Sequence, residues 1–224
     1  MKDQTEAGGA AGARITDIGP HRVAVGDVTQ GAVAVVMAGE KADVIYSDPP
    51  WGEGNLRYWR THANDPAQPT WEPFVEAWTR AAAEALRPGG GIFVEMGLRW
   101  EGGFAEALAG VGLPVRYRWE TQYRGGSKLL PVALLYSGPE LRGDFNPAPL
   151  RGPALPRACV EAAARVLGLF DRPVPRGLVL DPCCGKGYTA RAAVAAGMRF
   201  RGNELNPKRA AVTVAWLESH PWKA

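Results

Sequence analysis

Four consecutive residues, Asp48-Pro49-Pro50-Trp51, combine groups that can hold and activate a flat ring bearing an amino group. They follow residues 42–47, an apolar run typical of a buried strand, and two prolines cannot continue a central strand because each lacks an N–H. Hydrogen bonds from an exocyclic NH2 to Asp48 and to the Pro49 carbonyl would localise the nitrogen lone pair, and Trp51 would stack on the ring, worth about 1–3 kcal/mol. This set predicts group transfer to the amine, mostly through positioning. A turn cap for Asp48 and a core aromatic for Trp51 are the structural alternatives.

A second stretch, residues 178–190, predicts a strand, a tight glycine loop and the start of a helix. Gly185 and Gly187 let the backbone approach a ligand closely, and Glu204 ends the next expected strand, where a carboxylate can accept both ribose hydroxyls. A phosphate-binding P-loop is excluded, because Lys186 is followed by Gly and no Gly precedes Gly185 by five positions. A dinucleotide, a nucleoside cofactor such as S-adenosylmethionine and a simple packing turn stay open. The dinucleotide is disfavoured, because the chain ends too soon for a second nucleotide-binding half.

Strands and helices alternate along most of the chain, which predicts an α/β fold with a mostly parallel sheet and helices on both faces. The expected strands are 22–28, 42–47, 92–95, 115–121, 132–136, 178–181 and 199–203. The expected helices are 30–39, 72–86, 104–109, 157–169, 187–196 and 207–218. Residues 52–70 are interpreted as a long polar loop and residues 138–156 as a linker.

Composition limits the class of protein. A chain of 224 residues suits one domain, and 26 Lys and Arg against 23 Asp and Glu give a net charge of +3, which permits an anionic partner but excludes a strongly basic coat protein. The cysteines, Cys159, Cys183 and Cys184, allow neither a disulfide framework nor a zinc site, so we expect a cytoplasmic setting and no metal. Residues 1–14 are expected to form a flexible leader rather than a signal peptide, followed by one domain over 15–224. No stretch has the length of a membrane span.

These motifs together carry a resemblance. With Val25-Gly26-Asp27 before Asp48-Pro49-Pro50-Trp51, residues 86–94 (LRPGGGIFV) after it, and the 181–187 loop last, the chain resembles the S-adenosylmethionine-dependent amino-methyltransferases of DNA in the permuted, beta-class arrangement. The similarity spans about residues 22–218. It implies a single Rossmann-like methyltransferase domain with a mostly parallel seven-stranded sheet, one antiparallel strand and a circularly permuted motif order.

The resemblance also implies roles for individual residues. The catalytic set would be Asp48, Pro49, Pro50 and Trp51, which would receive the target base. The expected contacts to S-adenosylmethionine, with Glu204 at the ribose and Asp27 at the adenine amino group, are Asp27, Asp48, Asp181, Cys183, Gly185, Gly187, Thr189, Glu204, Leu205 and Asn206. Candidate contacts to nucleic acid, for which a solvated charged face is the alternative, are Arg57, Trp59, Arg60, Arg116, Arg118, Arg124 and Lys128.

The implied function is transfer of a methyl group from S-adenosylmethionine to the exocyclic amino group of a DNA base, with adenine N6 favoured. Cytosine N4 methylation, adenosine methylation of RNA and a silent nucleic-acid-binding partner subunit are the alternatives; a nicotinamide oxidoreductase is disfavoured. Trp51 in place of the commoner Tyr or Phe is similar to the messenger-RNA adenosine methyltransferases, whereas the intact motifs speak against a silent subunit.

The beta-class enzymes usually carry a target-recognition domain, for which residues 137–156 leave no room. We therefore expect specificity to come from loops, from a homodimer or from a separate specificity subunit, in a bacterial or phage-type setting that includes restriction-modification. No membrane partner is expected.

Overall fold

The computed structural model describes residues 12–65, 70–125 and 128–222, without the side chains of residues 124, 125 and 128. Its strands are β1 (Arg14–Ile18), β2 (His21–Val25), β3 (Ala42–Ser47), β4 (Leu86–Gly97), β5 (Tyr117–Gly125), β6 (Lys128–Ser137), β7 (Leu178–Asp181) and β8 (Arg199–Glu204). They form one eight-stranded sheet in the order β1-β2-β8-β7-β3-β4-β6-β5. The strand that precedes the Asp-Pro-Pro-Trp turn therefore lies next to the strand that precedes the glycine loop.

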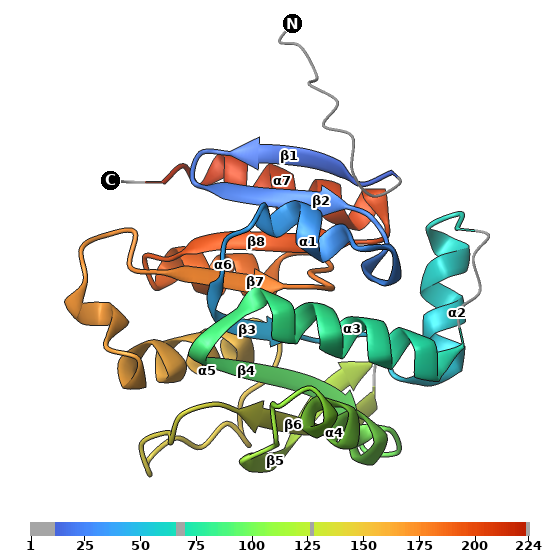
Figure 1. Cartoon of the computed structure of the whole chain (residues 1–224), viewed down its shortest axis with the longest axis horizontal. Coiled ribbons are helices and arrows are strands. Elements are labelled where there is room, and N and C mark those ends of the chain that lie inside the picture. The colour runs from blue at the N-terminus through green and yellow to red at the C-terminus, as the bar shows by residue number, and fades with distance from the viewer. Residues whose placement is uncertain (1–11, 66–69, 126–127, 223–224) are drawn as a thin grey trace, which may run out of the picture.

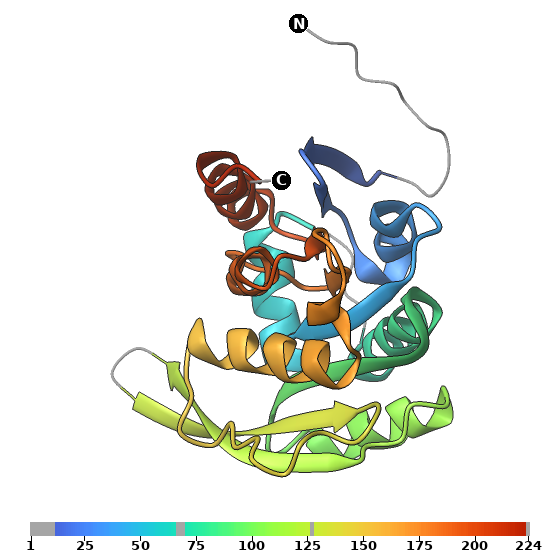
Figure 2. The same cartoon turned by 90° about the vertical axis from the view of Figure 1, so that its left-hand side faces the viewer.

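Helices cover both faces of this sheet. Their bounds are α1 (Ala32–Met37), α2 (Gly52–His62), α3 (Trp71–Ala85), α4 (Glu101–Gly110), α5 (Ala154–Val166), α6 (Tyr188–Ala195) and α7 (Pro207–Ser219), with short 3-10 turns at Val28–Gln30 and Leu169–Asp171. Helices α1, α3 and α4 pack on one face, and α5, α6 and α7 on the other (Figures 1 and 2). Helix α2 stands at the edge of the sheet, beyond the carboxyl end of β3 (Figure 1).

The central strand β3 shows why the sheet needs both helical layers. Val44 and Tyr46 point into the core beneath α5 and α6, whereas Ile45 points into the core beneath α1 and α3. All six residues of β3 are buried, as expected for a strand of a parallel sheet that is covered on both faces. A continuous apolar run such as residues 42–47 is typical of this position.

The predicted α/β fold with a mostly parallel sheet is confirmed, with two differences of detail. The described residues form eight strands rather than seven, because Arg14–Ile18, within and next to the expected leader, pairs with β2 as an edge strand. Two strands rather than one, β1 and β6, run opposite to the other described strands of the sheet. Strand β1 is mostly exposed and lacks an apolar run, which is why its sequence does not predict it. The leader itself, residues 1–11, lies outside the described residues.

The prediction of a loop over residues 52–70 is wrong for its first half, which is helix α2. The helix has few apolar side chains, and among its large residues only Leu56 and Arg60, four positions apart, are buried. An arginine at a buried position hides the helical periodicity, because pattern analysis counts it as polar. Among the helices of the described residues, none has the length and apolar composition that a membrane span requires.

Candidate active site

The Asp-Pro-Pro-Trp turn lies at the carboxyl edge of the sheet, between two neighbouring strand ends. Strand β3 is parallel to β4 on one side and to β7 on the other, so the turn has the end of β4 and the glycine loop beside it. Ligands bind at this edge of open parallel sheets. The two motifs that the sequence separates by more than a hundred residues therefore meet at one site.

Trp51 is held in place by the end of β4. Its indole Nε1 donates to the carbonyl oxygen of Glu95 at 3.3 Å, and the ring packs on Gly97, where an added Cβ would lie 3.3 Å from it. The next residue, Gly52, has φ +77°, and Trp100 fills the place of a side chain there. Trp51 remains partly exposed, so one surface of the indole is accessible to a ligand.

A pocket of about 520 Å³ opens beside this turn. Loops after β2, β3, β7 and β8 line it together with α2 and α3, through Gly26, Asp27, Val28, Asp48, Pro50, Leu56, Trp59, Arg60, Phe74, Pro182, Cys183, Asn203, Glu204, Leu205 and Arg209. The mixture of apolar walls and a few carboxylates suits a ligand with an aromatic base and hydroxyl groups.

Half of the expected cofactor contacts line this pocket, namely Asp27, Asp48, Cys183, Glu204 and Leu205. The others, Asp181, Gly185, Gly187, Thr189 and Asn206, lie behind them and support the loops. Sequence analysis did not single out Asn203, Arg209, Leu56 or Phe74 as lining residues. Asn203 lies within β8 and directly precedes Glu204, so its place next to an expected ribose contact was an available signal.

Asp181 shows how the supporting residues act. Its carboxylate accepts hydrogen bonds from Ser47 at 2.8 Å, from Thr189 at 2.6 Å and from the N–H of Cys183 at 3.0 Å. It therefore ties the end of β3 to the glycine loop and to α6. Burial raises the pKa of Asp181 to about 6, against these hydrogen bonds, which favour the charged form.

Both glycines of the loop have a left-handed backbone conformation, and protein atoms occupy the place of a side chain at each. Gly187 has φ +83°, and a Cβ there would meet Thr213 of α7 at 2.8 Å. Gly185 has φ +54°, and a Cβ there would meet the guanidinium of Arg209 at 2.5 Å. The structure thus gives both glycines a role in protein packing, and the expectation that they make room for the cofactor itself stays a prediction.

Glu204 connects both loops that follow β7 and β8. Its two carboxylate oxygens accept from the N–H groups of Gly185 at 2.7 Å and Asn206 at 2.9 Å. Burial raises its pKa, whereas these hydrogen bonds and Arg209, 3.9 Å away, favour the charged form. Each oxygen of a carboxylate can accept a second hydrogen bond, so Glu204 can still accept hydroxyl groups of a ligand.

Asn203 provides an unpaired acceptor at the pocket wall. Its amide nitrogen donates to the carbonyl oxygen of Pro182 at 3.1 Å, but its buried Oδ1 has no hydrogen-bond partner among the described residues. Buried polar atoms are rarely left without a partner. A ligand that brings a donor, such as a ribose hydroxyl or an amino group, would satisfy this atom, so the residues present fit a nucleoside cofactor.

Three carboxyl groups lie close enough to one another to interact, those of Asp48, Glu95 and Asp181. The carboxyl group of Asp48 opens onto the pocket, while protein atoms surround it on its other sides. This burial, and then the charges of Glu95 and Asp181, raise the pKa of Asp48 well above its usual range. Burial raises the pKa of Glu95 to about 7, although the hydroxyl of Tyr46 donates to it at 2.9 Å. Sequence analysis missed Glu95, whose signal is a lone acid within the apolar strand residues 91–97.

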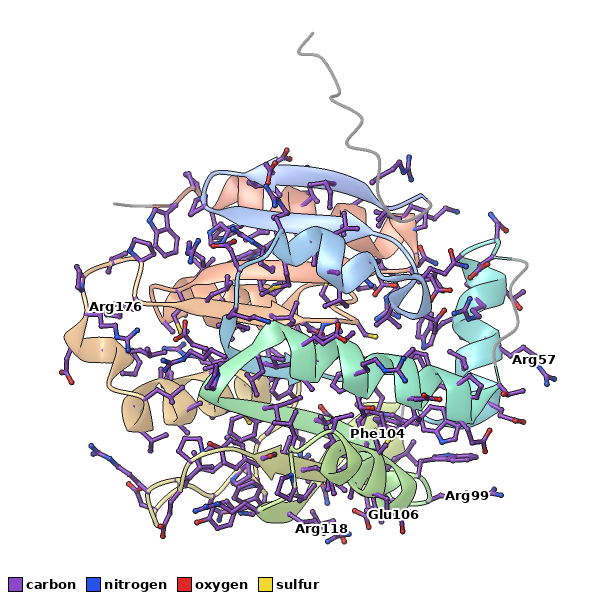
Figure 3. The ribbon with its side chains drawn as sticks, viewed as in Figure 1. Arg57, Arg99, Phe104, Glu106, Arg118 and Arg176 are labelled. Atoms are coloured by element: carbon purple, nitrogen blue, oxygen red, sulfur yellow. The ribbon has the colours of Figure 1, made fainter. Side chains whose placement is uncertain are left out.

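Of the α2 residues that were expected to contact nucleic acid, one lies on the surface and the others face the pocket or the interior. Arg57 is exposed and points away from the molecule (Figure 3). Trp59 lines the pocket instead, with the guanidinium of Arg209 4.0 Å from its ring centre. Arg60 is buried and pairs with Asp27 at 2.8 Å and with Asp65. The prediction that Arg60 contacts nucleic acid is therefore corrected, because its charge is neutralised inside the protein.

The basic residues of β5 do not join Arg57 in one patch. Arg118 is exposed, but two of its nitrogens donate to the carboxylate of Glu101 at 2.8 Å, and it lies far from Arg57 along the molecule (Figure 3). Arg116 is exposed and lies 4.0 Å from Glu140. The side chains of Arg124 and Lys128 are outside the described residues. Arg99, which the sequence analysis did not include, points outward on the same side of the molecule as Arg57 (Figure 3).

No metal centre is found in the part of the chain that the structure describes. Within residues 12–65, 70–125 and 128–222, no three or more His, Cys, Asp or Glu side chains gather in a way that could hold a metal ion.

Comparison with known proteins identifies solved structures that share this fold. No family model matches the sequence, and no curated protein matches it. Among solved structures, the chain is similar to M1.HpyAVI, with a TM-score of 0.62 and 15% identity over 87% of this chain and 97% of that chain. A complex of M1.HpyAVI with SAM gives a TM-score of 0.62 and 16% identity over 87% and 97%.

A third similar structure is the PvuII DNA methyltransferase, described as cytosine-N4-specific, with a TM-score of 0.57 and 14% identity over 88% of this chain and 86% of that chain. Identities this low show a shared fold and no more. The chain thus has the mixed α/β fold of a solved DNA methyltransferase, over most of its length.

Proposed function

We propose that the protein transfers a methyl group from S-adenosylmethionine to the exocyclic amino group of a base in DNA, with adenine N6 as the favoured target. The observation that carries this proposal is the position of the Asp48–Trp51 turn at the carboxyl edge of a parallel sheet, where Asp48 lines the same pocket as Glu204 and Cys183. The shared fold with a DNA methyltransferase and with a protein crystallised with SAM supports it.

The pocket residues fit S-adenosylmethionine. Glu204 would accept the ribose hydroxyls, and the unpaired Oδ1 of Asn203 would accept another donor of the ligand. Leu56 and Phe74 provide apolar walls for an aromatic base, and Asp27 retains acceptor capacity beside its ion pair with Arg60. When bound, S-adenosylmethionine supplies an electrophilic methyl group.

Asp48 and the Pro49 carbonyl would accept hydrogen bonds from the amino group of the target base. These bonds favour a tetrahedral nitrogen with a localised lone pair. The negative charge of Asp48 then stabilises the positive charge that develops on that nitrogen, which is a contribution to the transition state rather than to binding. Trp51 would hold the base by stacking.

The order of the motifs supports the permuted arrangement. Strand β3 and its catalytic turn precede β7 and its glycine loop in the sequence, while the two strands are neighbours in the sheet. Between β6 and α5 the structure contains only the short connection 138–153. We propose that loops, a second copy of the chain or a separate specificity subunit complete the recognition of DNA, in a restriction-modification system or another bacterial or phage setting.

The pocket accepts either amine, so cytosine N4 remains the second candidate for the target, and adenosine in RNA the third. The fold shared with a cytosine-N4-specific enzyme favours cytosine N4 in DNA over adenosine in RNA. A silent partner subunit is disfavoured, because neither motif is interrupted in the sequence and Asp48 and Cys183, one from each motif, line the same pocket.

The test is incubation of the protein with isotope-labelled S-adenosylmethionine and fragments of genomic DNA or total RNA, followed by digestion and nucleoside mass spectrometry. We expect label in N6-methyladenine from DNA. Label in N4-methylcytosine or in RNA adenosine would select one of the alternatives. Calorimetric binding of S-adenosylmethionine without any labelled nucleoside would favour the silent subunit.

A further inference from the structure

Two arginines line the pocket, and their charges have different surroundings. Arg60 is buried and pairs with Asp27 and with Asp65, so its charge is neutralised inside the protein. Arg209, near the start of α7, keeps 27% of its side chain exposed, and its Nε lies 3.9 Å from Glu204, too far for a hydrogen bond. This Nε is buried and has no hydrogen-bond partner among the described residues. The charge of Arg209 is therefore available to a ligand of the pocket.

Two neighbours fix the plane of the Arg209 guanidinium. Its central carbon lies 4.0 Å from the ring centre of Trp59 on α2, which is a favourable contact between a cation and an indole. It also covers Gly185, since a Cβ there would lie 2.5 Å from its Nη2. A guanidinium donates hydrogen bonds in its own plane, so packing against an aromatic ring leaves its N–H groups available. Arg209 is thus oriented to donate two parallel hydrogen bonds to a planar anion.

The position of Arg209 relative to Glu204 and Asp48 indicates which part of S-adenosylmethionine it meets. The sulfonium of this molecule joins three groups, namely the ribose, the methyl group and the methionine chain. With the ribose at Glu204 and the methyl group at Asp48, the methionine chain starts between them. Burial raises the pKa of Asp48 and of Glu204, and the charge of Arg209 lowers both, so Arg209 lies within electrostatic reach of each.

The charges that line the pocket favour an anionic group beside Arg209. Asp27, Asp48 and Glu204 suit donors such as hydroxyl and amino groups, but they repel a carboxylate. S-adenosylmethionine carries one carboxylate, at the end of its methionine chain. An arginine binds a carboxylate through two parallel hydrogen bonds, which are stronger than hydrogen bonds between neutral groups. The anionic end of the ligand therefore matches Arg209.

We propose that Arg209 holds the α-carboxylate of S-adenosylmethionine and so anchors the methionine end of the cofactor. This inference rests on the proposed function and adds a binding residue to its site. Glu204 would hold the ribose and Arg209 the methionine chain, so the sulfonium is fixed through both of its larger substituents. Its methyl group then keeps one direction relative to the Asp48 turn, which is the positioning that the reaction requires.

The experiment compares two ligands that differ only in this group, S-adenosylmethionine and decarboxylated S-adenosylmethionine. Calorimetry measures their dissociation constants for the unmodified protein and for Arg209→Met, whose side chain keeps an apolar contact with Trp59 without the charge. We expect the unmodified protein to bind the decarboxylated form roughly 10- to 100-fold more weakly, because a hydrogen bond between charged groups is lost. In Arg209→Met the two ligands should bind within about threefold of each other.

Two further variants separate this contact from general damage. Lys208→Met removes the positive charge of the neighbouring, exposed residue of α7, and its ligand preference should stay within about twofold of that of the unmodified protein. Arg209→Lys keeps the charge without the planar fork, so it should retain part of the preference.

The inference is overturned if the unmodified protein binds both ligands equally, or if Arg209→Met weakens the binding of both by the same factor. A preference that Lys208→Met loses as well would also overturn it. Failure of the proposed function gives a different result, because an unmodified protein can bind S-adenosylmethionine with this preference and still leave every nucleoside unlabelled.

Discussion

At the scale of single residues, a glycine at position 187 can be explained in two ways: by close approach of a ligand or by packing against the rest of the protein. The sequence pattern predicts close approach to a ligand, but the structure shows Thr213 of α7 in the space of a side chain and a φ of +83°. A side chain there would therefore strain the backbone and displace α7. The glycine contributes to the site by allowing the loop and the helix to pack.

We predict that Gly187→Val destabilises the whole fold, by about 1–3 kcal/mol from overpacking and more from the left-handed backbone. Urea unfolding measures the free energy. Gly103→Val is the matched control, because a Cβ at this exposed position in α4 meets nothing within 4 Å. Full stability of Gly187→Val combined with loss of S-adenosylmethionine binding would instead support a direct ligand contact.

The carboxyl cluster predicts a pH dependence. In the proposed reaction Asp48 acts as a carboxylate. Burial and then the charges of Glu95 and Asp181 raise its pKa, so activity should fall as the pH drops through that raised pKa. Glu95→Gln removes one neighbouring negative charge and should move this acid limb to lower pH. The pH profile of kcat/KM measures the limb, with Glu120→Gln at an exposed position of β5 as the control. If the acid limb of Glu95→Gln stays at the same pH or moves to higher pH, the charge of Glu95 does not raise the pKa of Asp48.

At the scale of elements, α2 is anchored by the buried side chain of Arg60, which pairs with Asp27 and with Asp65. Arg60 and Asp27 keep only 2% and 7% of their side-chain surfaces exposed, and their nitrogen and oxygen lie 2.8 Å apart. The amide of Asn206 donates to the carbonyl oxygen of His62 at 2.9 Å, which ties the end of α2 to the start of α7. The helix supplies Leu56 and Trp59 to the pocket, so its position decides the shape of the site.

We predict that Arg60→Met lowers the free energy of unfolding by roughly 3–5 kcal/mol, because Asp27 is left as an uncompensated buried charge. Binding of S-adenosylmethionine should weaken as α2 loosens. Arg57→Ala, on the exposed side of the same helix, should change stability by less than about 0.5 kcal/mol. Equal stabilities of the two variants in denaturant titration would contradict this account of α2.

The elements also show what a sequence can and cannot predict. Strand β3 and the loop after β7 follow from an apolar run and from glycines, because both are local patterns. Helix α2 does not, since its buried positions include Arg60, whose partner Asp27 is 33 positions away in the sequence. Tyr123 and Glu95 carry no motif at all, and only the pairing of β4, β6 and β5 brings them to Trp51. The Asp-Pro-Pro-Trp turn was predictable, whereas its surroundings depend on long-range pairing.

At the scale of the whole molecule, the small net charge of +3 and the separation of Arg57 from Arg118 argue for weak binding of nucleic acid by the isolated chain. If about three phosphates are contacted, the logarithmic salt slope is about −2.7, and affinity falls roughly 40-fold between 50 and 200 mM salt. Fluorescence anisotropy with a labelled duplex measures this slope, and Arg57→Ala should reduce it by about 1. Tight binding that is insensitive to salt would contradict the prediction.

The central claim is that the turn after β3 performs methyl transfer at an amino group, and Asp48→Ala tests it most directly. We predict that this variant binds S-adenosylmethionine within about threefold of the original affinity in calorimetry, while the rate of methyl transfer to DNA falls roughly 10³-fold or more. Asp48→Asn, which retains one acceptor oxygen without the charge, should be impaired no more than Asp48→Ala. Methyl transfer by Asp48→Ala at the rate of the unmodified protein would contradict the assignment of this pocket.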